Sequence, residues 1–169
     1  QGLKVGKDDL YLWANYVCDI FLFSRIPKYN RSLIKQQHSL DKYYCIDNGL
    51  RGAVLMPQSN DNGKKLENTV FMQLNRIKQP SDSITYYQDA GECDFVIQRN
   101  ERVIQLIQAT WDMSDESTRE REVSGILEAS RATGCDQLFI VTKDEEGIIR
   151  REGKQIYTVP AWKWLLMNN

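Results

Sequence analysis

The sequence lacks the residue patterns by which several common functional classes are identified. It has one histidine in 169 residues, which leaves little scope for His-rich metal sites or His-based catalytic triads. Its four cysteines lie far apart and form no CxxC pair, so we expect reduced, buried thiols rather than a zinc site. No G-x-x-x-x-G-K-S/T loop is present, and this chain alone is not expected to bind ATP.

The chain also lacks a strong charge of either sign and a long apolar run. Lys and Arg total 22 against 23 Asp and Glu, so no global basic field indicates nucleic acid. No apolar run approaches the roughly 18 residues of a membrane span, and no secretory signal opens the chain. We therefore expect a cytoplasmic protein without a membrane partner. The first residue is Gln1 rather than methionine, so either the start was processed away or the chain is a piece of a longer protein.

The first third of the chain, residues 1–61, is predicted to be a helical and basic N-terminal appendage. Apolar residues at helical spacing predict a helix over 8–23. A polar stretch with an excess of Lys and Arg follows over 24–42. A short β-prone run over 43–47 and one or two helical turns over 50–56 complete this part.

The rest of the chain, residues 62–169, is predicted to be an α/β domain. Three closely spaced β-prone segments follow an amphipathic helix, and a second helix then leads to an apolar strand. A three-strand meander followed by a helical crossover implies a mixed sheet with helices on its faces. The predicted elements are helix 62–79, strands 84–88, 93–99 and 103–111, helix 117–133, strand 138–142, a hairpin of 148–151 with 155–159, and a short helix from 160.

Acidic and amide side chains on this scaffold form a candidate site. Glu67 lies one position off the apolar stripe of the first helix, Asp94 is in the second strand, and Gln108 is in the third. Two carboxylates and a neighbouring oxygen suit a hard cation such as Mg²⁺ or Mn²⁺, which could bind a phosphate and acidify a water for phosphodiester attack. The alternative is that Asp94 is an ordinary turn or cap partner.

The order of these elements and acids resembles that of the PD-(D/E)XK nuclease superfamily. More specifically, the chain resembles the C-terminal domain of unknown function of archaeal-type AAA+ ATPases. The resemblance implies a restriction-endonuclease-like core, an upstream ATPase domain in the parent chain, and DNA as a partner. The segments that carry it are KYYCIDNGLR (42–51), GKKLEN (63–68), GECDFV (91–96), TRERE (118–122) and PAWKWLL (160–166).

The resemblance also implies roles for the acidic residues. Glu67 and Asp94 match two metal ligands of the nuclease motif, but the third-strand E-x-K reads Gln108-Ala109-Thr110. Gln108 can still offer a neutral carbonyl oxygen to a metal, whereas Thr110 has no ammonium to hold or deprotonate a water. We therefore predict a degenerate catalytic centre of Glu67, Asp94, Gln108 and Thr110, with Glu67, Asp94 and Gln108 as ligands for Mg²⁺ or Mn²⁺.

The basic stretch is predicted to contact nucleic acid, with a solvated loop as the alternative. His38, in the same stretch, is predicted to be a loop residue. The nucleic-acid-binding residues are predicted to be Arg25, Lys28, Arg31, Lys35 and Lys42.

These patterns favour a DNA-binding or regulatory domain of an AAA+ ATPase with a degenerate catalytic centre. Two alternatives stay open: an active Mg²⁺-dependent DNA endonuclease, and a protein-interaction module without a nucleic-acid role. The near-neutral charge and the residues Trp162 and Trp164 motivate the last alternative. Core packing is the other interpretation of both tryptophans.

Overall fold

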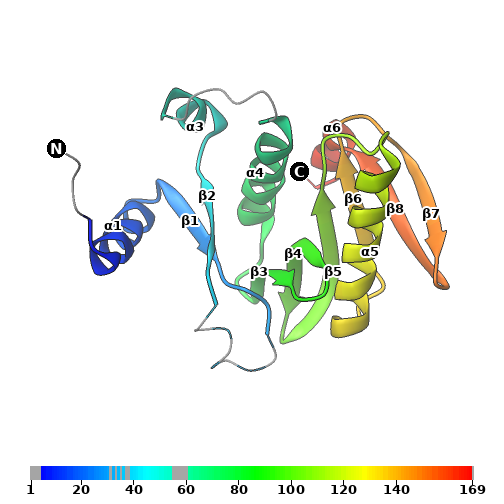
Figure 1. Ribbon diagram of the computed structural model, residues 1–169, viewed down its shortest axis with the longest axis horizontal. Helices are drawn as coiled ribbons and strands as arrows, with labels where there is room; N and C mark the ends of the chain where they lie inside the picture. Colours follow the sequence, from blue (N-terminus) through cyan, green and yellow to red (C-terminus); the bar gives the residue numbers. More distant parts are fainter. Residues whose placement is uncertain are drawn as a thin grey trace.

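The computed structural model describes residues 5–30, 32, 34, 36, 39–54 and 61–168 (Figure 1). Arg31, Lys35 and His38 therefore lie outside the described residues, as does the end of the helical turns predicted over 50–56. The described elements are α1 (Lys7–Asp19), β1 (Phe23–Ile26), β2 (Lys42–Cys45), α3 (Asn48–Val54), α4 (Asn62–Ile77), β3 (Asp82–Gln88), β4 (Glu92–Arg99), β5 (Arg102–Ala109), α5 (Glu116–Thr133), β6 (Leu138–Thr142), β7 (Gly147–Arg151), β8 (Lys154–Pro160) and α6 (Ala161–Met167).

The predicted mixed α/β architecture is confirmed. The larger sheet has six strands in the order β3-β4-β5-β6-β8-β7. Strands β3, β4 and β5 form an antiparallel meander, and α5 then carries the chain to β6, which pairs parallel to β5. Strand β8 pairs parallel to β6, and the predicted hairpin places β7 antiparallel at the edge.

Helices cover both faces of this sheet, so its core has two layers (Figure 1). On one face, apolar residues of α4 and the buried Trp164 of α6 pack with Phe95 and Ile107 of the sheet. On the other face, the apolar residues of α5 pack against Leu106 and Leu138. Helix α5 starts at the cap Asp115, whose side chain accepts from the Thr118 N–H. Burial on both faces explains why β6 reads as a continuous apolar run.

The smaller sheet joins the N-terminal part of the chain to the same core. Strand β1 pairs antiparallel with β2, and the Tyr44 ring of β2 stacks on Phe71 of α4 with 4.3 Å between the ring centroids. The helix predicted over 8–23 is wrong at its end, because α1 stops at Asp19. Phe21 has a φ of 61°, a left-handed conformation that no helix continues through, and the chain then enters β1.

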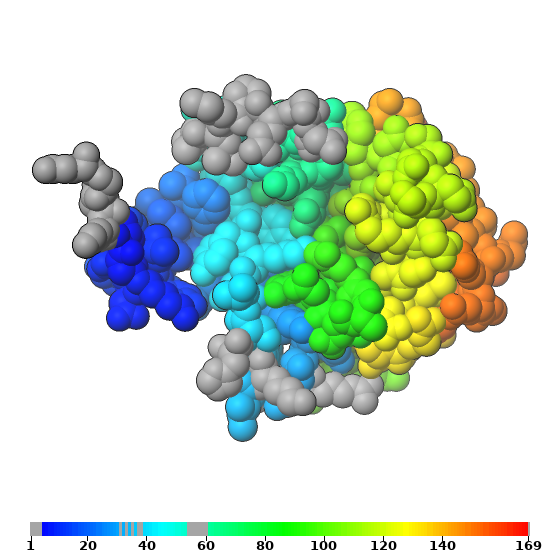
Figure 2. All heavy atoms as spheres, viewed as in Figure 1, coloured from blue at the N-terminus to red at the C-terminus, as the bar shows by residue number. Residues whose placement is uncertain are grey.

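Helix α1 lies at the surface of the fold. Among its described residues none is buried, and it stands at one end of the molecule, apart from α5 and β7 (Figure 2). Its large exposed apolar side chains are Leu10, Tyr11, Leu12, Trp13 and Tyr16.

At the other end of the chain, Trp162 is 61% exposed and Trp164 only 2%. The interpretation of both tryptophans as core residues is therefore confirmed for Trp164 alone.

The four cysteines have free thiols, as predicted. Burial is confirmed for Cys45, Cys93 and Cys135 but is wrong for Cys18, which is only partly buried. Burial raises the pKa of the Cys93 thiol, the most enclosed of them. No helix in the described part of the chain is both long and apolar enough to cross a membrane.

Close backbone packing joins α5 to the start of β4. A Cβ added at Gly125 of α5 would lie 2.3 Å from the Glu92 carbonyl oxygen, and one added at Gly91 would lie 3.0 Å from the Gly125 Cα. Only a residue without a side chain lets the helix approach the strand this closely. The contact therefore sets the position of Glu92 and of the strand that follows it.

We expect Gly125→Ala to destabilise the fold by about 1–3 kcal/mol, because the new methyl group overlaps the Glu92 backbone. Gly63→Ala is the matched control: it is also helical, and nothing lies within 4 Å of its added Cβ. The control should keep its stability or gain up to about 1 kcal/mol from helix propensity. Urea unfolding measures both, and equal stability of the two variants would contradict the close contact.

Candidate functional site

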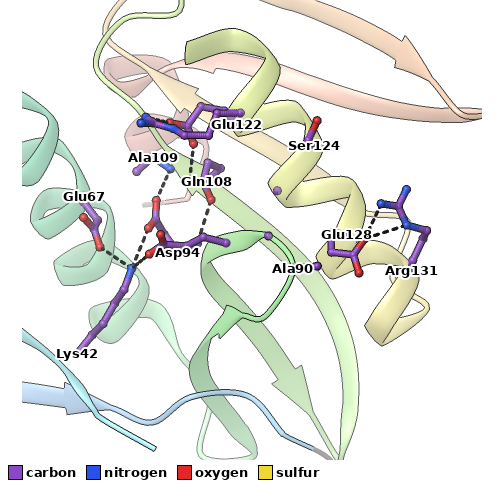
Figure 3. Close-up of a pocket in the computed structure, with 14 residues that line it drawn as sticks. Lys42, Glu67, Ala90, Asp94, Gln108, Ala109, Glu122, Ser124, Glu128 and Arg131 are labelled. Atoms are coloured by element: carbon purple, nitrogen blue, oxygen red, sulfur yellow. Dashed lines mark hydrogen bonds and ion pairs between the residues drawn. The ribbon is translucent and has the colours of Figure 1, made fainter. Parts of the chain in front are cut away.

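A pocket of about 530 Å³ lies at the edge of the sheet where β4 begins and β5 ends (Figure 3). Because these strands are antiparallel, the first residues of β4 and the last residues of β5 meet there. Helices α4 and α5 and strand β2 close its sides. The charged and amide residues that line it are Lys42, Glu67, Glu92, Asp94, Gln108, Arg121, Glu122, Glu128 and Arg131.

The Lys42 ammonium lies among three carboxylates of this pocket. Its Nζ is 2.8 Å from Glu92 Oε1, 3.0 Å from Asp94 Oδ1 and 3.4 Å from Glu67 Oε1. Burial alone would lower the pKa of Lys42, but the three carboxylates together raise it well above its ordinary value. Lys42 is also one of the residues predicted to contact nucleic acid, and the structure places its charge inside the pocket.

Asp94 is the most enclosed of the three acids, with its side chain only 8% exposed. Its Oδ1 faces Lys42, and its Oδ2 accepts from the Ala109 N–H at 3.0 Å. Burial and the nearby Glu67 charge hold the pKa of Asp94 above its ordinary range, against the opposing effect of Lys42. The ammonium is therefore the main group that favours the ionised form of this carboxyl.

Glu67 enters the pocket from α4 and is oriented by β2. Its Oε1 accepts a hydrogen bond of 2.7 Å from the Tyr44 hydroxyl, in addition to the contact with Lys42. Burial and the Glu67 charge both raise the pKa of Tyr44, so this hydroxyl stays a proton donor. The spacing of Glu67 in its helix did not reveal this partner, because Tyr44 lies 23 residues away in the sequence.

Gln108, predicted to be a metal ligand, makes hydrogen bonds on both sides of its amide. Its Oε1 accepts from the Asp94 backbone N–H at 3.0 Å, and its Nε2 donates to Glu122 of α5. Glu122 also accepts from Arg121 at 2.6 Å. An N–H on one side and a carboxylate on the other define the orientation of the amide. Gln108 therefore ties β4 to α5, and its oxygen is engaged by the backbone.

Thr110 lies beyond the pocket. It follows the last residue of β5, its side chain is buried, and its N–H donates to the Val141 carbonyl oxygen of β6. Thr110 is not among the described residues that line the pocket. Of the predicted catalytic residues, the structure brings together Glu67, Asp94 and Gln108.

The other predicted nucleic-acid-binding residues lie outside the pocket lining where they are described. Arg25 of β1 is half exposed and lies 3.8 Å from Asp41. Lys28 pairs with the exposed Asp89 at 2.8 Å. The exposed Arg25 pair is of a kind that contributes little to stability, so this cation can exchange its partner for a phosphate, whereas the Lys28 side chain is only 20% exposed.

The pocket does not offer a ready site for a divalent cation. The facing oxygens of Glu67 and Asp94 contact Lys42, and the Gln108 oxygen accepts a backbone N–H. Among the residues that the structure describes, no group of three or more His, Cys, Asp or Glu side chains is arranged to hold a metal ion. These residues therefore do not fit Mg²⁺ or Mn²⁺ as they stand.

Sequence reasoning missed Glu92 and Glu122. Glu92 opens β4 at a position that reads as an exposed strand end, whereas Glu122 interrupts the apolar side of α5 next to Val123. An acidic residue next to the buried apolar positions of a helix can be recognised in a sequence as a candidate site residue, because a buried carboxylate requires a partner.

Comparisons with protein-family models, with curated proteins and with solved structures found no match to this chain.

We expect Gln108→Glu to destabilise the protein by about 2–3 kcal/mol, because it replaces the donor that faces Glu122 with a second carboxylate. The exchanged pair Gln108→Glu with Glu122→Gln restores a donor opposite an acceptor. It should regain most of the lost stability. Urea unfolding at neutral pH measures the single and double variants. A single variant as stable as the original protein would contradict the network.

Proposed function

We propose that this chain is a nuclease-like domain that binds DNA without hydrolysing it, as an accessory or regulatory part of an AAA+ ATPase. The observation that carries the proposal is the meeting of Glu67, Asp94 and Gln108 at one edge of the sheet. They come from α4, β4 and β5, the elements that hold the acids and the third motif of the PD-(D/E)XK pattern. The ATPase partner rests on the sequence resemblance alone.

The third strand supports a centre without hydrolysis. In the nuclease pattern, a Lys on this strand helps to hold or deprotonate the attacking water. Here β5 ends in Gln108 and Ala109, and Thr110 lies outside the pocket. The nearest cation of α5, Arg121, pairs with Glu122, and a guanidinium that stays protonated is a poor base.

The basic surface near β1 supports contact with DNA. Arg25 and Lys28 belong to the same stretch as Arg31 and Lys35, which lie outside the described residues. The exposed aromatic side chains of α1 are close by in the fold, since Asn15 of α1 accepts a hydrogen bond from Arg25. Cations beside exposed aromatic rings suit a nucleic acid, which offers phosphates and base faces.

Fluorescence anisotropy with a labelled DNA duplex and a branched DNA tests the binding. The variant Arg25→Ala with Lys28→Ala should bind about tenfold more weakly, and its salt dependence should be shallower by about two counterions. The control, Lys154→Ala with Lys163→Ala, removes two paired cations from β8 and α6 and should bind as before. Absence of binding at low salt, or an equal loss in the control, would contradict the proposal.

An active Mg²⁺-dependent DNA endonuclease is the second candidate. The observation in its favour is the Lys42 ammonium 3.0 Å from Asp94, a positive charge from β2 that β5 lacks. This candidate requires a metal ion to displace that ammonium from the carboxylates. Incubation of plasmid and junction DNA with Mg²⁺ or Mn²⁺ decides between the two candidates. The proposal expects no cleavage. Cleavage that Asp94→Ala abolishes would establish the endonuclease, whereas equal cleavage by both proteins would come from a contaminant.

A protein-interaction module is the third candidate, and the apolar surface of α1 favours it. Light scattering coupled to size exclusion tests it on the isolated chain. A monomer that binds DNA argues against this candidate, and a stable oligomer that does not bind DNA supports it.

A further inference from the structure

We propose that the Lys42 ammonium is the resident cation of the pocket, held between Glu67, Glu92 and Asp94 where a divalent metal would otherwise bind. The centre is then independent of metal. This inference deepens the proposed function, because it gives a reason for the lack of hydrolysis. It rests on the non-hydrolytic part of that function and not on DNA binding.

The first support is the match between donors and acceptors. An ammonium has three N–H donors, and three carboxylate oxygens, one from α4 and two from β4, lie within 3.4 Å of Lys42 Nζ. Figure 3 shows Lys42 reaching from β2 toward Glu67 and Asp94, with the dashed contacts meeting at its nitrogen. The three acids therefore converge on one point, and that point holds a cation of the chain itself.

The second support is that the other cations of the pocket have acidic partners of their own. Arg121 pairs with Glu122, and Arg131 pairs with Glu128 and Glu152. Lys42 is therefore the cation that compensates Glu67, Glu92 and Asp94 within the described part of the pocket. Removing it would leave three carboxylates close together, an arrangement that is costly unless protons or another cation replace the charge.

The third support is the way in which Lys42 is held. Its side chain is three-quarters buried, and its Nζ lies 5.3 Å from the centre of the Tyr86 ring, which adds a cation–π contact. An ammonium tethered to β2 also competes with a free ion at an effective concentration on the order of millimolar or higher. A metal ion would have to displace this group before the carboxylates could bind it.

Mn²⁺ binding, followed by electron paramagnetic resonance of the free ion in the absence of DNA, tests the inference. The original protein and Lys42→Arg, which keeps the charge, should show no binding that depends on Asp94. Lys42→Met should bind Mn²⁺ at least about tenfold more tightly than either. Adding Asp94→Asn to Lys42→Met should abolish that gain.

Two results would overturn the inference: Mn²⁺ binding by the original protein that Asp94→Asn removes, or a folded Lys42→Met that gains no binding. If Lys42→Met does not fold alone, Lys42→Met with Glu92→Gln carries one carboxylate fewer and takes its place in the same comparison. DNA binding is measured separately on the Arg25 and Lys28 variants. A failure of the metal experiment is therefore distinguishable from a failure of DNA binding.

Discussion

The ion contacts of Lys42 are the interaction on which the arrangement of the pocket depends. Three carboxylates from α4 and β4 lie within 3.4 Å of one ammonium, and each would repel the others without it. The pocket also draws together three parts of the fold, since Lys42 belongs to the small sheet, Glu67 to a helix and Asp94 to the large sheet. An electrostatic contact at the sheet edge thus complements the apolar packing beneath it.

Asp94 links this cluster to a second set of hydrogen bonds. One carboxylate oxygen faces Lys42, the other accepts from the Ala109 N–H, and the backbone N–H of Asp94 donates to Gln108. Gln108 continues the chain of contacts to Glu122 on α5. Buried polar groups are stable only when such partners are present, so each residue of this network constrains the next. Gln at position 108 is therefore compatible with a well-ordered pocket.

The N-terminal part of the chain contributes side chains to the pocket. Strand β2 supplies Lys42 to the pocket, and Tyr44 both packs on Phe71 and donates to Glu67. Arg25 of β1 lies on the same small sheet as Lys42, so a short, hydrogen-bonded pair of strands connects it to the pocket.

Local sequence patterns determined most of the secondary structure. Helical and alternating periodicity indicated α4, the β3-β4-β5 meander, α5, β6 and the β7-β8 hairpin, because these signals arise between residues a few positions apart. These local patterns did not predict that α1 ends at Asp19 or that β1 forms, since that strand depends on pairing with β2 about 20 residues later.

The candidate site, too, could be predicted from the sequence only in part. Its acids Glu67 and Asp94 were identified from their places in a helix and a strand. Their partner Lys42 lies 25 and 52 residues from them, and only the docking of β2 beside α4 decided that it enters the pocket. Sequence by itself therefore determined which chemical groups are available and on which elements. The tertiary structure decided which charges meet, because the contacts of a buried ammonium are set by the packing of distant elements rather than by neighbours in the chain.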